Sequence, residues 1–148
     1  MDRLRPTMSR RDTIARLKAV PLFQNCSARQ LRRIANLGRE STFEAGRNLC
    51  EEGKFSKEFF VILEGHAEVR RGGRKRGTLG SGDYFGEIAL LRSSLIDRSP
   101  RTATVTATEP LRCFRLGARE FAYVLYEQDV AVKILREVVH RLDVPSGE

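Results

Sequence analysis

The chain has 148 residues, of which 41% are hydrophobic and 31% charged, and its formal net charge is +8. This length suits one domain with a sizeable core, and the apolar content is too high for an intrinsically disordered chain. No apolar stretch reaches the length of a membrane-spanning helix, and residues 1–6 lack the apolar segment of a secretion signal. We therefore expect a soluble protein without a membrane span.

The positive charge is concentrated in two places: at the amino terminus and in the run at residues 70–76. A basic chain can bind nucleic acid, an acidic membrane surface or an anionic small ligand. The remaining basic residues are scattered, and such clusters are typical of a solvated tail and a charged hairpin tip.

The three cysteines, Cys26, Cys50 and Cys113, lie far apart in the sequence. Their spacing is not that of a zinc site, and their odd number does not suit a disulfide framework. Each lies among apolar neighbours, which predicts buried, reduced thiols. We expect a cytoplasmic protein without a bound metal.

Residues 1–11 are basic and aperiodic, and we expect a disordered tail there. A helical pattern begins after Asp12, a suitable N-cap. The segment at 27–30 has the pattern of a capping box, and Gly38 is placed to end the helix that follows. The sequence therefore predicts helices within residues 12–38.

Short segments rich in strand-forming residues follow between glycines. The predicted strands cover residues 41–45, 48–51, 58–63, 67–71, 75–79, 101–108 and 111–116. The apolar run from 59 to 63 suits a strand buried on both faces. Glu64-Gly65 predicts a turn, and Gly72-Gly73 predicts a hairpin. Many short strands at this spacing indicate a sandwich, barrel or roll.

Helical patterns return at residues 118–126 and 129–142, and the second carries a wide apolar stripe that must cover another surface. Helices, then strands, then helices predict an α+β fold.

Residues 82–104 contain the strongest chemical signal. Gly86 lacks a side chain, so a ligand can approach its backbone closely. The helix-forming residues 87–91 come next, and the free N–H groups of a helix start favour an anion. Arg101 could pair with two phosphate oxygens, and Glu87 could accept a hydrogen bond from a sugar hydroxyl. Thr102 adds a hydroxyl group beside the arginine.

Each of these residues also has an ordinary explanation. Glu87 could be a first-turn acid at a helix start, Arg101 a solvated side chain and Thr102 a strand former. The ordered combination is the evidence for a binding site.

This combination resembles the signature of the cyclic-nucleotide-binding domain family. The matching residues are Gly82-Asp83-Tyr84-Phe85-Gly86-Glu87-Ile88-Ala89-Leu90 and Pro100-Arg101-Thr102-Ala103-Thr104-Val105. Leu22-Phe23 and the segment from Phe60 to Gly65 are also similar to the family, and the likeness covers about residues 20 to 140. We refer to residues 85–104 as the cassette.

The resemblance implies an eight-stranded, jelly-roll-like β-roll flanked by N-terminal helices and two C-terminal helices. The roll would span residues 41–116 and the C-terminal helices 117–143. One domain would then cover residues 12–143, with a short tail at 144–148.

The resemblance also assigns roles to individual residues. Arg101 would bind the cyclic phosphate and Glu87 the ribose 2′-hydroxyl, while Thr102 would face the phosphate or the purine edge. The remaining ligand-binding residues would be Phe85, Gly86, Ile88 and Ala89 in the cassette, and Val138, Val139 and Leu142 in a final helix that covers the base.

We therefore expect a cyclic-nucleotide sensor, with cAMP preferred over cGMP, that acts through its C-terminal helix on an effector protein or an attached domain. We do not expect an enzyme, because His66 and His140 lie in no catalytic motif and both are expected at the surface.

Two alternatives remain at this point. The chain could be a fragment of a catabolite-activator-type transcription regulator, although too little sequence follows Leu142 for a DNA-binding helix-turn-helix. It could also be an interaction domain of the same fold that has lost its ligand. The segment at 92–99, which is longer than in compact family members, is a surface insertion or brings Asp97 close to Arg101.

Overall fold

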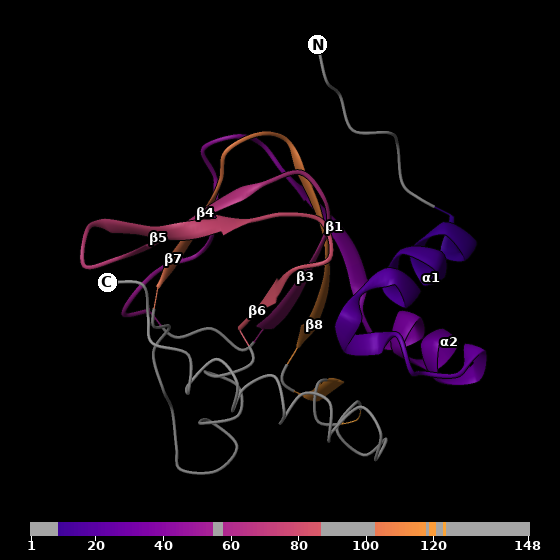
Figure 1. Ribbon diagram of the computed structural model, residues 1–148. Helices are drawn as coiled ribbons and strands as arrows, with labels where there is room; N and C mark the ends of the chain where they lie inside the picture. Colours follow the sequence, from indigo (N-terminus) through magenta and orange to yellow (C-terminus); the bar gives the residue numbers. More distant parts are fainter. Residues whose placement is uncertain (1–8, 55–57, 87–102, 118, 121–122, 124–148) are drawn as a thin grey trace.

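A computed structural model of the chain describes residues 9–54, 58–86, 103–117, 119–120 and 123 (Figure 1). These residues form two α-helices, one 3-10 helix and eight strands. The elements are α1 (Arg10–Ala19), η1 (Pro21–Phe23), α2 (Ala28–Leu37), β1 (Arg39–Phe43), β2 (Asn48–Cys50), β3 (Glu58–Glu64), β4 (Ala67–Arg71), β5 (Arg74–Leu79), β6 (Tyr84–Phe85), β7 (Thr104–Ala107) and β8 (Leu111–Gly117).

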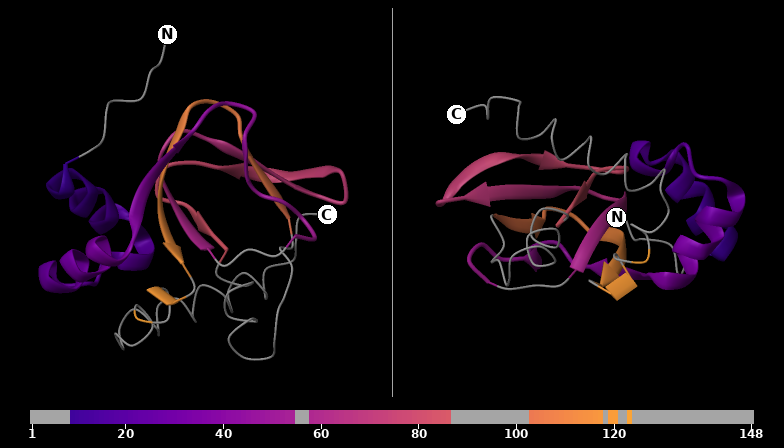
Figure 2. Two further views of the ribbon diagram at one scale, coloured as in Figure 1. Left: turned by 180° about the vertical axis from the view of Figure 1, so that it is seen from behind. Right: turned by 90° about the horizontal axis from the view of Figure 1, so that it is seen from below.

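The strands form two antiparallel four-stranded sheets. Sheet A has the order β1-β8-β3-β6 and sheet B the order β2-β7-β4-β5. Both helices pack on the outer side of sheet A, away from sheet B (Figures 1 and 2). The expected α+β fold with an eight-stranded roll is confirmed. Of the expected C-terminal helices, only Arg119, Glu120 and Tyr123 are described, and all three are helical.

Helix α1 begins earlier than the sequence pattern predicted. Its N-cap is Ser9, whose hydroxyl oxygen accepts a hydrogen bond from the backbone N–H of Asp12 at 3.1 Å. Asp12 therefore lies in the first turn, where its negative charge favours the helix start, and its prediction as the N-cap was wrong. Residues 10 and 11 belong to this helix and not to a disordered tail.

Helix α2 begins at the predicted capping box. The Ser27 hydroxyl accepts from the Gln30 N–H at 3.1 Å, and the Gln30 side chain accepts from the Ser27 N–H at 2.8 Å. The helix ends at Gly38, where the backbone is extended. A Cβ atom at this position would overlap the Phe114 ring and lie 2.6 Å from the carbonyl oxygen of Arg115. Close packing on β8 therefore explains this glycine.

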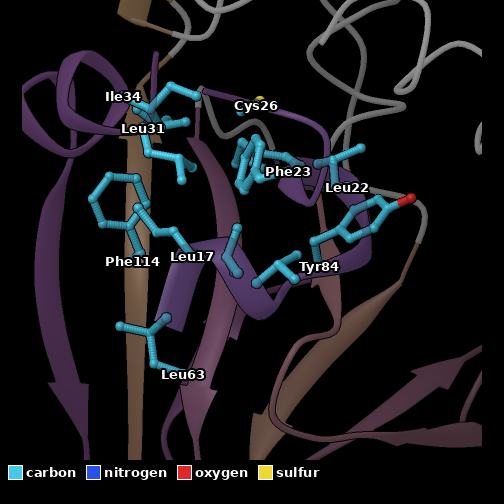
Figure 3. Close-up of a cluster of buried hydrophobic side chains, with 13 residues drawn as sticks. Leu17, Leu22, Phe23, Cys26, Leu31, Ile34, Leu63, Tyr84 and Phe114 are labelled. Atoms are coloured by element: carbon cyan, nitrogen blue, oxygen red, sulfur yellow. The ribbon is translucent and has the colours of Figure 1, made fainter. Parts of the chain in front are cut away.

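Strand β3 in sheet A is buried on both faces, as its apolar run predicted. Residues of β3 that point toward the helices alternate with residues that point toward sheet B. The helix-facing core consists of Leu17, Val20, Leu22, Phe23, Cys26, Leu31, Ile34, Phe59, Val61, Leu63, Tyr84, Phe114 and Leu116 (Figure 3). The inner core consists of Leu49, Cys50, Phe60, Ile62, Ala67, Phe85, Val105, Ala107, Leu111 and Cys113.

The three cysteine side chains are buried and form no disulfide, as predicted. Cys113 lies in the inner core, where burial is the main factor that raises the pKa of its thiol to about 12.

One charged side chain is buried beneath α1. Arg112 on β8 is 1% exposed and forms an ion pair with Glu40 of β1. Its Nε also lies 3.5 Å from Oε1 of Glu64. Arg16 of α1 lies 3.8 Å from the same carboxylate and donates a hydrogen bond to the Leu63 carbonyl at 3.2 Å. These four charged residues link α1 to three strands of sheet A.

The predicted hairpin between β4 and β5 is also confirmed. Gly72 and Gly73 have φ angles of +61° and +76°, which glycine adopts without strain. Strand β6 was not predicted, because two residues are too short to form a recognisable pattern.

Candidate functional site

The turn that leads into the cassette is held against strand β3. The Gly82 N–H donates to the Ile62 carbonyl at 2.8 Å, and the Ile62 N–H donates to the Asp83 carbonyl at 2.8 Å. The Asp83 carboxylate closes the turn by accepting from the Gly80 N–H at 2.7 Å. These bonds fix the direction in which β6 leaves the turn.

Two predicted site residues stand at the start of the cassette. The Phe85 ring stacks on Phe60 of the inner core, with 4.8 Å between ring centroids and 11° between ring planes. Gly86 follows with φ +99°, in the left-handed region that side chains disfavour. Glycine is therefore favoured at position 86 by its backbone conformation, and the Phe85 ring packs in the inner core.

The end of the cassette is anchored to the segment that follows β2. The Thr104 hydroxyl oxygen accepts a hydrogen bond from the Glu52 N–H at 2.8 Å. The Cys50 thiol donates to the Ala103 carbonyl at 3.6 Å. Strand β7 then pairs with β2 on one side and with β4 on the other.

The cassette therefore begins in one sheet and ends in the other. Phe85 at its start belongs to sheet A, and Val105 just after its end belongs to sheet B, yet both side chains lie in the inner core. The fold thus places the side chains of Phe85 and Val105, at the two ends of the cassette, on the same side of sheet A.

The other predicted site residues lie outside the described part of the chain. They are Glu87, Ile88, Ala89, Arg101, Thr102, Val138, Val139 and Leu142. The segment at 92–99 and His140 also lie outside it.

Sequence reasoning missed Cys50 and Glu52 as residues next to the cassette. Their position directly after a short strand was visible, but the pairing of β2 with β7 was not. Beside them, hydrogen bonds from Lys54 and then Asn48 hold the pKa of the exposed Glu51 carboxyl below its usual value. Glu51, which directly follows β2 near the end of the cassette, therefore loses its proton at a lower pH than an ordinary glutamate does.

His66 lies at the surface, as predicted. Its side chain is 59% exposed, and its Nδ1 forms a hydrogen bond with the Glu109 carboxylate. Within the described ranges, no three His, Cys, Asp or Glu side chains are grouped so that they could hold a metal ion. None of the helices in those ranges is long and apolar enough to cross a bilayer.

Residues 40–128 match the model of the cyclic nucleotide-binding domain family. This range includes the whole cassette and, apart from Arg39 at the start of β1, all the strands of the roll. The chain belongs to the cyclic nucleotide-binding domain family.

The chain is similar to curated regulatory proteins and to solved structures of the same fold. It is 37% identical over 118 residues to a cAMP-dependent protein kinase regulatory subunit of Mycosarcoma maydis, and the match covers 74% of this chain and 22% of the relative. The chain thus spans less than a third of that relative.

Two solved structures superpose with a TM-score of 0.76, and each match covers 88% of this chain. One is the regulatory domain of Toxoplasma gondii protein kinase A with cAMP, at 23% identity and covering 50% of that chain. The other is the regulatory subunit of a cAMP-independent protein kinase A from Trypanosoma brucei, at 22% identity and covering 46% of that chain. At these identities the likeness establishes the fold alone.

Proposed function

We propose that this chain binds a cyclic nucleotide at the cassette, cAMP in preference to cGMP, and serves as a regulatory sensor domain without catalytic activity. The observation that carries the proposal is the placement of the signature within the family fold. Both ends of the cassette meet the inner core, one from each sheet, and Gly86 has a left-handed backbone. The sequence similarity to a cAMP-dependent kinase regulatory subunit supports the choice of cAMP.

The chemistry of the cassette assigns a role to each polar residue. The planar guanidinium of Arg101 matches two phosphate oxygens, and Thr102 adds a hydroxyl beside it. The Glu87 carboxylate accepts the ribose 2′-hydroxyl. The backbone N–H groups of Gly86, Ile88 and Ala89 face the phosphate, as at other helix starts that bind anions.

The proposed output passes through the C-terminal helix, whose apolar residues Val138, Val139 and Leu142 cover the base. A ligand shifts a conformational equilibrium only as far as it binds one state better than the other. Contacts made by this helix in the liganded state alone supply that difference. Because the curated relative is a kinase regulatory subunit, a protein kinase is the effector that we propose.

Calorimetric titration with cAMP and with cGMP tests this function. We expect Arg101→Ala to lower cAMP affinity at least about thirtyfold, because truncating one partner of a buried charge pair commonly costs this much or more. Arg98→Ala is the matched control, since it removes the same charge three positions away. This variant should bind cAMP like the wild type.

The titration separates the alternatives. Absence of heat with both nucleotides at high concentration would support an interaction domain that has lost its ligand. Equal cAMP affinity in wild type and Arg101→Ala would overturn the assignment of the phosphate site. Tighter binding of cGMP would overturn the proposed preference.

A further inference from the structure

The β4–β5 hairpin carries the densest positive charge of the described surface. It extends away from the helices, beyond the other labelled strands (Figures 1 and 2). Every residue from 70 to 76 is exposed. The five basic side chains of this segment are Arg70, Arg71, Arg74, Lys75 and Arg76. We refer to them as the basic hairpin tip.

The strand register places these like charges opposite one another. Arg71 pairs with Arg74, and Arg70 pairs with Lys75. Like charges directly opposite each other in a sheet destabilise the pairing. The hairpin therefore holds an unfavourable charge arrangement that an anionic partner would relieve.

One of the five charges is compensated within the hairpin. Arg70 forms two hydrogen bonds with the Glu68 carboxylate, at 3.1 and 3.3 Å. Within the described ranges, the structure gives no carboxylate ion pair to Arg71, Arg74, Lys75 or Arg76. These four side chains stand at the end of a two-stranded ribbon and are exposed to solvent.

The backbone of the hairpin offers a second means of recognition. Among the described strands, β5 is the last strand of sheet B and pairs only with β4. An edge strand can pair with an extended segment of another protein, and side chains on opposing strands then lie close together. The tip already accommodates one acid, because the Glu52 carboxylate accepts the Gly72 N–H at 2.9 Å.

The composition of the hairpin distinguishes among anionic partners. Residues 67–79 include no aromatic side chain that could stack on a nucleic acid base. They also lack an aromatic or large apolar group at the tip that would enter a lipid surface. An extended acidic segment of a protein fits this surface better, because its carboxylates can contact the basic side chains while its backbone pairs with the edge of β5.

We propose that the basic hairpin tip and the edge of β5 form a docking site for an acidic, extended segment of a partner protein. The segment adds to sheet B as a fifth strand. Its carboxylates lie against Arg74, Lys75 and Arg76. This site adjoins the end of the cassette, because Arg70 pairs with Thr104 and Glu52 forms hydrogen bonds with both Gly72 and Thr104. It does not depend on the identity of the nucleotide.

The probe is a fluorescently labelled peptide of alternating Glu and Thr, and its binding is measured by fluorescence anisotropy. The measurement is made at about 0.1 M salt, because exposed charges farther apart than about 10 Å are then screened and close contacts dominate the affinity. We expect the double variant Arg74→Glu, Arg76→Glu to lower peptide affinity about tenfold or more. The control Arg29→Glu, Arg32→Glu makes the same charge change on the exposed face of α2 and should shift affinity less than about twofold.

Two further probes test the chemistry of the partner. The same peptide methylated on every backbone nitrogen keeps the charges but lacks N–H donors, and we expect it to bind more weakly. Equal binding of the methylated peptide would overturn strand addition. Binding of oligouridylate or phosphatidylserine vesicles through the hairpin, tighter than that of the peptide, would overturn a protein partner.

Equal peptide affinity in the hairpin variant and the wild type would overturn the site itself. The thermal unfolding temperature and cAMP binding of each variant check that the fold is intact. Peptide binding and nucleotide binding are measured separately. The peptide titration therefore tests the docking site even if the chain binds no nucleotide.

Discussion

The two cores on either side of sheet A are built from different side chains. The helix-facing core contains mostly large groups, with Phe23, Phe59 and Phe114 among the fully buried ones. The inner core combines the stacked rings of Phe60 and Phe85 with branched aliphatic side chains, two alanines and two cysteines. The inner core also adjoins both ends of the cassette, whereas the helix-facing core holds α1 and α2 on the sheet.

Because the cassette adjoins one core and not the other, we expect mutations in the two cores to have different effects on stability and on nucleotide binding. A defect in the helix-facing core should lower the free energy of unfolding without changing the nucleotide affinity of the folded protein. A defect in the inner core should change both, because the cassette residues on either side of the site pack there.

The largest effect is expected from the buried charge on the helix side. Arg112→Ala should lower the free energy of unfolding by about 3–5 kcal/mol, because it leaves the largely buried carboxylates of Glu40 and Glu64 without their main partner. Urea unfolding measures this change. Nucleotide affinity at low temperature should stay unchanged.

Arg115→Ala on the same strand is the control. Arg115 is 23% exposed, and its Nη2 lies 2.5 Å from Oε2 of Glu58. Water can replace this interaction in part, so we expect a loss of about 1 kcal/mol. Equal losses in the two variants would contradict burial as the cause.

A smaller effect should distinguish the two faces directly. Phe59→Leu and Phe85→Leu each remove one ring contact, the first with Tyr84 on the helix side and the second with Phe60 in the inner core. Each should lower the free energy of unfolding by about 1–2 kcal/mol.

Calorimetry should then separate the two variants. Phe85→Leu should weaken cAMP binding about fivefold, since Phe85 fixes the backbone that enters Gly86, while Phe59→Leu should change it less than twofold. Equal nucleotide affinities would refute the functional difference between the cores.

The smallest effect concerns alkaline pH. The Cys113 thiol keeps its proton to a higher pH in the folded protein than in the unfolded chain. Its pKa is about 12 when folded and near 9 when unfolded. Its contribution to stability is therefore complete below about pH 9 and is lost as the pH rises toward 12. Between about pH 9 and 10 the free energy of unfolding should fall by about 1 kcal/mol more in wild type than in Cys113→Ala. Parallel pH profiles would contradict the proposed cause.

Much of the fold could be predicted because local signals were strong. The Ser27 capping box, the apolar run of β3 and the two glycines of the hairpin each specify a conformation through their own neighbours. The start of α1 was misplaced, although Ser9 and Asp12 stand at capping distance in the sequence. Boundaries of this kind depend on which of two suitable caps the tertiary structure uses.

The buried Arg112 could not be predicted. Its partners Glu40 and Glu64 are distant in sequence, and only the pairing of β8 with β1 and β3 brings them together. The cassette signature was visible because its residues are close in sequence, but the anchoring of its end by Cys50 and Glu52 depends on the pairing of β2 with β7.

The burial of strand β3 on both faces has a consequence for how the strands of sheet A find their partners during folding. In a sheet with one wet face, a slip of one residue moves apolar groups into water, and this cost specifies the correct alignment. In strand β3 such a slip exchanges one apolar face for another. A slip of β8 by one residue, however, turns Arg112 and Arg115 to the other face of the sheet, away from Glu40 and Glu58. These two arginines therefore oppose a one-residue slip of the central strands.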